Sequence, residues 1–356
     1  MQATIAVLPG DGIGPEVIDA AEQVINVVAD RFGHSFTLTR WPVGGVALRN
    51  GDSPLPLSTK KACVLADAVL LGAVGDPEFD HGPREGRPET ALLQLRLELG
   101  VFANLRPAKV WPGLEDGSSL KPDLIRSLDL LIVRELTGGL YYGEPRGRTD
   151  NDEVAFNTMR YSRAEIERIA KVAFESARLR KGLVTSVDKA NVLETSQLWR
   201  EVVTKVGVGY PDVKLEHQYI DSCALLLVSN PKKFDVLLAG NLFGDILSDE
   251  AGAVVGSLGL LPSASLGNRG GLFEPVHGSA PDIAGKNVAN PIAAIASAAM
   301  LLRHALGAED EAQAVEQAIA ATLSVGLRTA DLQDNTDKTN VVSCSEMTQA
   351  IVECLS

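Results

Sequence analysis

Residues 240–259 read GNLFGDILSDEAGAVVGSLG, and this stretch sets Asp245 and Asp249 four positions apart in a predicted helix. A spacing of four brings both carboxylates to one helix face. Two like charges held that close cost free energy unless a cation or a basic cluster lies between them. Because the surrounding residues are glycine-rich and apolar, the pair predicts a hard divalent metal such as Mg²⁺ or Mn²⁺. An ordinary solvated pair is the alternative.

On both sides of this stretch, short apolar runs alternate with longer helical patterns. The alternation predicts an α/β protein in which helices cover a largely parallel sheet. The predicted strands are residues 4–8, 68–71, 130–133, 184–187, 215–219 and 236–238, and the predicted helices are residues 15–31, 90–99, 163–180, 193–206, 242–255, 291–306, 310–325 and 346–355.

Bulk composition restricts the class of protein. The chain of 356 residues is long enough for two domains, or for one large α/β unit, and its 45% hydrophobic content is that of a globular protein. A net charge of −13 argues against nucleic acid and anionic membranes as partners. The four cysteines show no CxxC spacing, and no signal peptide or membrane-length apolar run is visible. We therefore expect a soluble, cytoplasmic protein.

Two segments depart from the simple alternation. Residues 142–160 are polar and turn-rich with strand-like ends, which predicts either a loop or an extended arm. The sequence GDGIG at residues 10–14 follows a strand and precedes a helix, but it lacks the spacing of the Rossmann fingerprint. We interpret it as a structural turn near a site rather than as a phosphate cradle.

Three arginines form the second candidate constellation. Arg96 lies in a predicted helix, Arg106 follows in the segment ANLRP, and Arg134 ends the strand LDLLIVR. A planar guanidinium matches a carboxylate bidentately, so an arginine cluster suits a di- or tricarboxylate substrate. Three unrelated surface arginines are the alternative.

Candidate proton-transfer groups follow other strand-like runs. Tyr141 and Lys189 have side chains that can serve as a general acid and a general base. An arm-packing tyrosine and a surface lysine explain them equally well. Asp221 follows the strand-like segment KLEHQYI and completes a three-carboxylate metal site with Asp245 and Asp249, unless it only caps a helix. The loop EPVHGSAPDIAG at residues 274–285 has the composition of a backbone that approaches a ligand closely.

Together these segments resemble the isocitrate/isopropylmalate dehydrogenase family of β-decarboxylating dehydrogenases. The resemblance rests on GDGIGPEV, VRELTGGLYYGEPRG, GNLFGDILSDEA and EPVHGSAPDIAGK, and it covers essentially the whole chain. It implies a two-domain α/β fold with a mixed sheet flanked by helices, which is not a Rossmann fold. Residues 1–101 and 257–356 would form a nucleotide-binding domain. Residues 102–256 would form a central domain with catalytic, metal and dimer-interface residues, including the arm 142–160.

The resemblance also assigns roles at matching positions. It implies a homodimer in which Lys189 and Asp221 reach the active site of the partner subunit. Lys189, directly or through water or Asp221, would remove the hydroxyl proton, and Tyr141 would protonate the carbon left by CO₂. The implied substrate ligands are Glu89, Leu92, Arg96, Arg106, Arg134 and Asp221; the implied ligands of Mg²⁺ or Mn²⁺ are Asp221, Asp245 and Asp249; and the implied NAD contacts are Asn191, Glu274, His277, Gly278, Ser279, Ala280, Asp282, Ile283, Asn290 and Asp331.

Two positions predict specificity within this family. The carboxylate of Asp282 can bond ribose hydroxyls and would repel a 2′-phosphate, which favours NAD. Leu92 matches the position that meets an isopropyl group, and a leucine pocket cannot satisfy an extra buried carboxylate. The implied reaction is NAD-dependent oxidative decarboxylation of (2R,3S)-3-isopropylmalate to 4-methyl-2-oxopentanoate and CO₂ in leucine biosynthesis. The alternatives are a relative acting on D-malate, tartrate or homoisocitrate, and a non-catalytic regulatory subunit that has kept the fold.

Overall fold

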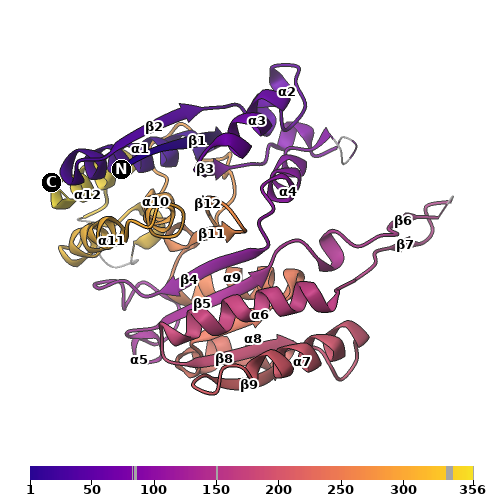
Figure 1. Ribbon diagram of the computed structural model, residues 1–356. Coiled ribbons are helices and arrows are strands. Elements are labelled where there is room, and N and C mark those ends of the chain that lie inside the picture. Colours follow the sequence, from indigo (N-terminus) through magenta and orange to yellow (C-terminus); the bar gives the residue numbers. More distant parts are fainter. Residues whose placement is uncertain (82, 84–85, 150, 334–339, 356) are drawn as a thin grey trace. The chain divides into compact units, whose positions relative to one another are not determined.

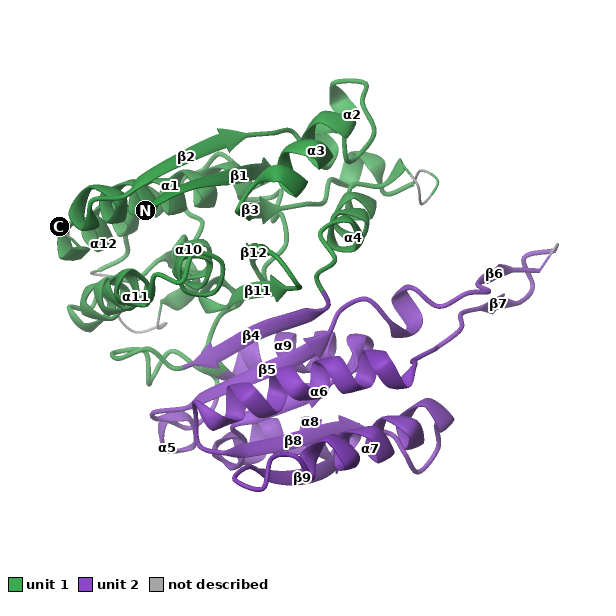
Figure 2. Ribbon diagram, viewed as in Figure 1, with its two compact units in different colours: residues 1–101, 110–119, 255–356 green, residues 102–109, 120–254 purple. Residues whose placement is uncertain are grey.

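The computed structural model describes residues 1–81, 83, 86–149, 151–333 and 340–355, which fall into two units (Figure 2). Unit 1 comprises Met1–Val101, Val110–Ser119 and Val255–Ser356, and unit 2 comprises Phe102–Lys109 and Leu120–Val254. Residues 110–119, placed in the central domain by sequence, group with unit 1.

In unit 1, the central strands are buried on both faces, as parallel strands covered by helices are. Every residue of β3 (AVLLGA) is buried, whereas the edge strand β2 (SFTLTR) alternates between half-buried and exposed residues. The strand order is β2-β1-β3-β12-β11, in which β11 and β12 are antiparallel and the other neighbours run parallel. The strands are β1 (Gln2–Gly10), β2 (Ser35–Arg40), β3 (Ala68–Ala73), β11 (Pro262–Leu266) and β12 (Gly271–Pro275).

Helices cover both faces of these strands (Figure 1). The helices α1, α10, α11 and α12 share one apolar cluster, while α3 and α4 pack with β1 and β3 in another. The helices of unit 1 are α1 (Gly14–Phe32), α2 (Gly45–Arg49), α3 (Leu57–Leu65), α4 (Glu89–Glu98), α10 (Ile292–His304), α11 (Glu309–Ser324) and α12 (Cys344–Leu355), with 3₁₀ turns η1 (Pro77–Phe79), η5 (Leu258–Leu260) and η6 (Ala330–Leu332).

The GDGIG segment forms the turn between β1 and α1. Gly10 and Gly12 adopt φ of 73° and 57°, a region that other residues occupy only with strain. Between them, the buried carboxylate of Asp11 accepts hydrogen bonds from the backbone amides of Gly45, Val46 and Gly75. These contacts support the interpretation of the segment as a structural turn.

In unit 2, the strand order is β4-β5-β10-β8-β9, with β4 antiparallel to β5 and the other neighbours parallel. In Figure 1, α6 and α7 lie over one face of these strands, and α8 and α9 lie behind the other. The strands are β4 (Ala103–Lys109), β5 (Asp129–Glu135), β8 (Leu183–Asp188), β9 (Lys214–Tyr219) and β10 (Val236–Ala239); the helices are α5 (Pro122–Ile125), α6 (Arg163–Arg178), α7 (Glu194–Gly207), α8 (Ile220–Ser229) and α9 (Asn241–Val255), with 3₁₀ turns η3 (Gly139–Tyr141) and η4 (Pro231–Lys233).

The candidate arm contains a short two-stranded ladder. Strands β6 (Gly147–Arg148) and β7 (Ala155–Phe156) pair antiparallel and project from the rest of unit 2 in Figure 1. Val154 and Phe156 are exposed on it.

The predicted α/β class with a mixed sheet is confirmed, and its topology positions the candidate residues of unit 2. Since β5, β10, β8 and β9 run parallel, their carboxyl ends meet at one edge, where sheets of this kind bind ligands. Within the described residues, none of the helices combines the length and apolarity needed to cross a bilayer.

Candidate active site

Helix α9 presents the two carboxylates of the opening motif on one face. Asp245 and Asp249 are one turn apart, and their side chains are 33% and 63% exposed. Partial burial raises the pKa of Asp249, and the charge of Asp245 raises it further, although Arg106 lowers it. The close pair is therefore real, but Asp249 is more exposed than the apolar sequence around it suggested.

Two buried arginines supply the positive charge that the pair needs. Arg134, at the end of β5, donates from Nη1 to Oδ1 of Asp245. Arg106, on the neighbouring strand β4, donates to Ser248 (2.6 Å) and lies 3.5 Å from Oδ1 of Asp245 and 3.8 Å from Asp249. A basic cluster thus offsets the repulsion between the carboxylates and leaves guanidinium groups beside them.

Tyr141 bonds the other oxygen of the same aspartate. Its hydroxyl donates to Oδ2 of Asp245 at 2.7 Å, and the guanidinium of Arg134 lies 5.6 Å from the centre of its ring. Burial, and then the hydrogen bond to Asp245, raises the pKa of Tyr141 to about 12. The phenol therefore stays protonated at neutral pH, as a general acid must before it acts.

Lys189 and Asp221 form a second, separate pair. Lys189 directly follows β8, Asp221 lies in the first turn of α8 after β9, and the two strands are parallel neighbours. Lys189 Nζ lies 2.6 Å from Oδ1 of Asp221, whose side chain is 66% exposed. The hydrogen bond from Lys189 lowers the pKa of Asp221. Both groups of this pair remain accessible from outside unit 2.

The predicted three-carboxylate metal site is not assembled within one chain. Among the residues that the structure describes, no three histidine, cysteine, aspartate or glutamate side chains are grouped closely enough to hold a metal ion. Asp245 and Asp249 supply two hard oxygen ligands, while Asp221 is bonded to Lys189. Within one chain, Asp221 therefore does not join Asp245 and Asp249.

Unit 1 holds the remaining arginine. Arg96, in α4, donates from Nη2 to Oε1 of Glu274 in β12 at 2.9 Å, and both side chains are buried. Arg96 Nε has no hydrogen-bond partner in the structure, although it is buried. Glu89, which begins α4, and Ser279 both lie next to Gly75. A β-carbon at Gly75 would be 3.3 Å from a side-chain oxygen of each. Leu92 packs partly buried against an apolar cluster of this unit.

The loop after β12 approaches the turn before α1. The amide of Ile13 donates to the carbonyl of Ser279 at 2.8 Å, and Ala280 adopts φ of 39°. Burial lowers the pKa of His277, whose Nδ1 lies 2.9 Å from the carbonyl oxygen of Gly278. The loop therefore packs closely against the backbone of the turn before α1.

The other predicted nucleotide contacts are distributed between the units. Asn290 donates to Asp331 at 3.0 Å, so these two are adjacent in unit 1. Asp282 and Gly278 are exposed and Ile283 is half-buried in the loop, whereas Asn191 is exposed in unit 2, two residues after Lys189.

Sequence reasoning missed two buried polar residues of unit 2. Asn241 begins α9 four residues before Asp245, and its Oδ1 accepts from Arg134 at 2.7 Å. Glu135 follows Arg134 and accepts from the amides of the turn after β5. The i, i+4 spacing that identified Asp249 also identifies Asn241, but an uncharged amide gives no repulsion argument.

Known proteins resemble this chain over nearly its whole length. The profile of the family described as isocitrate/isopropylmalate dehydrogenase matches residues 4–351. The chain is 54% identical to the 3-isopropylmalate dehydrogenase of Prochlorococcus marinus (strain MIT 9313), covering 99% of both chains. It is 53% identical to that of Bacillus subtilis (strain 168), covering 99% of this chain and 98% of the relative. The solved isocitrate dehydrogenase of Methylococcus capsulatus superimposes with a TM-score of 0.88 at 36% identity, covering 99% of both chains.

Proposed function

Since the chain belongs to the isocitrate/isopropylmalate dehydrogenase family, we propose that it oxidises and decarboxylates (2R,3S)-3-isopropylmalate to 4-methyl-2-oxopentanoate and CO₂ with NAD⁺, in leucine biosynthesis. It is an oxidoreductase of this family. The observation that carries the proposal is the cluster at Asp245, where two buried arginines and a protonated tyrosine surround one carboxylate.

The substrate assignment rests on charge and on one apolar side chain. Arg96, Arg106 and Arg134 provide guanidinium groups for the two carboxylates of a malate skeleton. Leu92 lies three residues into the helix that Glu89 begins, and its half-buried side chain would be the apolar contact for a branched alkyl group. A third carboxylate at that position would be buried without a partner, which disfavours isocitrate.

The donor set fits a hard divalent ion and an NAD-type nucleotide. Asp245, Asp249 and a second copy's Asp221 would hold Mg²⁺ or Mn²⁺, because carboxylate oxygens are the ligands these ions prefer. The loop from Glu274 to Asn290 would hold the nucleotide, with the exposed Asp282 bonding ribose hydroxyls. When bound, the metal supplies Lewis acidity at the substrate carbonyl and NAD⁺ accepts the hydride.

The protein's own side chains then handle the protons. Lys189 takes the proton from the substrate hydroxyl, directly or through a water or Asp221, to which it is already hydrogen-bonded. Tyr141, held protonated at Asp245, delivers a proton to the carbon that loses CO₂. The arginines keep the substrate carboxylates oriented throughout.

We further propose that the active protein is a homodimer. In α8, the side chains of Leu225 and Val228 are 69% and 40% exposed, and in α9 that of Ile246 is 54% exposed. These two helices also carry Asp221 and Asp245. An apolar surface of this kind suits contact with a second copy, which would also bring Asp221 and Lys189 to Asp245. The acidic net charge disfavours nucleic acid and anionic membranes, and we expect a cytoplasmic location.

The test is substrate discrimination by the purified protein. It should reduce NAD⁺ with 3-isopropylmalate and Mn²⁺, and far more slowly with isocitrate, D-malate, tartrate or homoisocitrate. Turnover of D-malate equal to that of 3-isopropylmalate would overturn the substrate assignment. Equal use of NADP⁺ would overturn the role of Asp282.

A further inference from the structure

The turn at residues 136–138 connects β5 to the 3₁₀ turn that ends at Tyr141, and two buried side chains hold its backbone. Asn241 donates from Nδ2 to two of its carbonyl oxygens, at 2.9 and 3.0 Å. Glu135 accepts from two of its amides, at 3.2 and 2.7 Å. Side chains thus bond two amides and two carbonyl oxygens of the turn, and the remaining amide, that of Leu136, donates to the backbone carbonyl of Phe102 at 2.9 Å.

Asn241 makes every hydrogen bond that its amide can make. Besides the two bonds from Nδ2, its Oδ1 accepts from Nε and Nη2 of Arg134 at 3.1 and 2.7 Å. The side chain is fully buried. An aspartate here would turn an oxygen toward two carbonyl groups, so only an amide of this length satisfies both the turn and the arginine.

Glu135 is likewise buried and fully engaged. Beyond the two amides, it accepts from Arg168 Nη2 at 3.2 Å and from the hydroxyl of Thr137 at 3.1 Å. Arg168 in turn lies 4.5 Å from the ring centre of Phe102. These contacts compensate a carboxylate that would otherwise be costly to bury.

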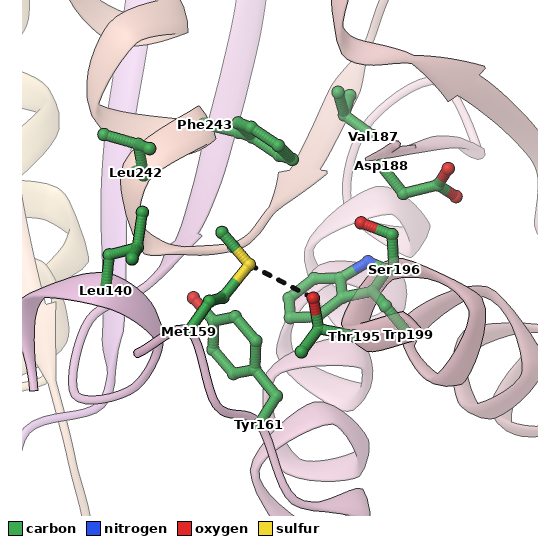
Figure 3. A pocket seen from close by; sticks show the side chains of 11 residues that line it. Leu140, Met159, Tyr161, Val187, Asp188, Thr195, Ser196, Trp199, Leu242 and Phe243 are labelled. Carbon is green, nitrogen blue, oxygen red and sulfur yellow. Dashed lines mark hydrogen bonds between the residues drawn. The ribbon is translucent and has the colours of Figure 1, made fainter. Parts of the chain in front are cut away.

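A small apolar pocket lies beside this region. A pocket of unit 2 is lined by Leu140, in the same 3₁₀ turn as Tyr141, and by Tyr161, Leu242 and Trp199 (Figure 3). On its border, the hydroxyl of Tyr161 accepts from the backbone amide of Asn241 at 2.7 Å. The ring of Tyr161 also packs against the turn, because a β-carbon at Gly138 would lie 2.7 Å from it. The turn thus has this ring beside it and the hydrogen bonds of Asn241 and Glu135 on its backbone.

Arg134 and Tyr141 bond the same carboxylate, that of Asp245. Arg134 bonds one oxygen of Asp245 and Tyr141 bonds the other. We propose that Asn241 and Glu135 are positioning residues: both fix the turn 136–138 so that Tyr141 meets Asp245 in the reactive geometry, and Asn241 in addition orients Arg134. The inference rests on the proposed function, because it requires Tyr141 to transfer a proton. A misplacement of about 1 Å at such a site costs about 100-fold in rate.

Unit 2 contains a matched control. Asp235, at the amino end of β10, is also buried and accepts from the amides of Lys181 (2.9 Å) and Leu183 (3.3 Å) and from Arg180 (2.8 Å). It repeats the construction around Glu135, but it lies at the opposite end of the strands from Tyr141. Asp235→Asn therefore reports what loss of such a carboxylate does to folding alone.

The experiment combines Glu135→Gln and Tyr141→Phe in a double-mutant cycle, with NAD⁺, Mn²⁺ and 3-isopropylmalate. We expect Tyr141→Phe to lower kcat by about 100-fold or more, and Glu135→Gln by about 10- to 100-fold with KM within about twofold. In the Tyr141→Phe background, Glu135→Gln should lower kcat by less than about twofold, because there is no hydroxyl left to position. Asp235→Asn should change kcat and KM by less than about twofold.

Asn241→Asp gives an independent measurement if Glu135→Gln does not fold. It should lower kcat and also raise KM, since it disturbs a substrate-binding arginine as well as the turn. Multiplicative losses in the cycle, or an equal kcat loss in Asp235→Asn, would overturn the positioning roles. Absence of 3-isopropylmalate turnover by the wild-type protein would instead overturn the proposed function, so the two failures are distinguishable.

Discussion

Asp245 and Asp221 are both aspartates bonded to cations at the carboxyl end of the strands of unit 2, yet the structure holds them differently. Asp245 accepts hydrogen bonds from Arg134 and Tyr141, and the guanidinium of Arg106 lies 3.5 Å away. Asp221 is mostly exposed and has one cation, Lys189. The first site is rigid within one chain, and the second is an open pair.

From this difference we infer how the two aspartates would act in the proposed dimer. Charges with several buried partners have a single arrangement, because breaking one contact leaves another charge uncompensated. Exposed ion pairs contribute little and exchange partners readily. In the proposed dimer, Lys189 and Asp221 would therefore be the pair that reaches another subunit's site, and Asp245 the carboxylate that receives them.

The largest effect is expected at the rigid side of the comparison. Asp245→Asn removes a metal ligand and the charge that Arg134 and Tyr141 bond, so kcat should fall by about 1,000-fold or more, as when a central electrostatic contact is lost. Steady-state NAD⁺ reduction with Mn²⁺ measures it. Asp212→Asn, which breaks the exposed pair with Arg178, is the control and should leave kcat unchanged. Retention of most activity in Asp245→Asn would remove the basis for the metal assignment.

The open side is tested by mixed dimers. Lys189→Ala and Asp245→Asn should each be inactive alone. If Lys189 acts in the partner's site, a dimer of one copy of each has one intact site, and random mixing of equal amounts should recover about a quarter of the wild-type activity. Differently tagged copies isolate the mixed species. If both residues act within one chain, mixing recovers nothing.

Sequence predicted the elements that have strong apolar patterns and missed those that do not. Residues 68–71 and 236–238 are continuous apolar runs, and they became the buried strands β3 and β10. Strand β2 has a mixed pattern because it is an edge, and β11 (PSASL) lies in the sheet without a β-rich apolar run. Such strands form because of the neighbouring strands with which they pair, and sequence periodicity does not show those neighbours.

The site divides in the same way. The spacing of Asp245 and Asp249 is a local property of one helix, so the sequence revealed it. The arginines and Tyr141 reach Asp245 from other strands and turns, and their convergence depends on strand order. Whether Asp221 completes the metal site depends on a second chain, which no local pattern specifies.

Metal removal distinguishes a catalytic ion from a structural one. Treatment with EDTA should abolish activity, and excess Mn²⁺ or Mg²⁺ should restore it. Because Arg106 and Arg134 already balance Asp245 without an ion, the unfolding temperature should fall only by the amount that loss of a bound ligand explains. Enzyme assays and thermal unfolding at several metal concentrations measure both. Unfolding caused by EDTA alone would show that the arginines do not stabilise the cluster.

The smallest expected effect is the alkaline pH dependence of stability. The pKa of Tyr141 is raised to about 12 by burial and by its bond to Asp245, against about 10 in an unfolded chain. The unfolded state therefore loses this proton first, so the contribution of Tyr141 is complete below pH 10 and is lost as pH rises from 10 to 12.

Urea unfolding of wild type and Tyr141→Phe between pH 8 and about 11 should show wild type losing its advantage, by no more than about 1.4 kcal/mol per pH unit for one group. A slope identical in wild type and Tyr141→Phe would mean that the phenol is not held by Asp245. Asp245 would then lack one of the contacts that distinguish it from Asp221.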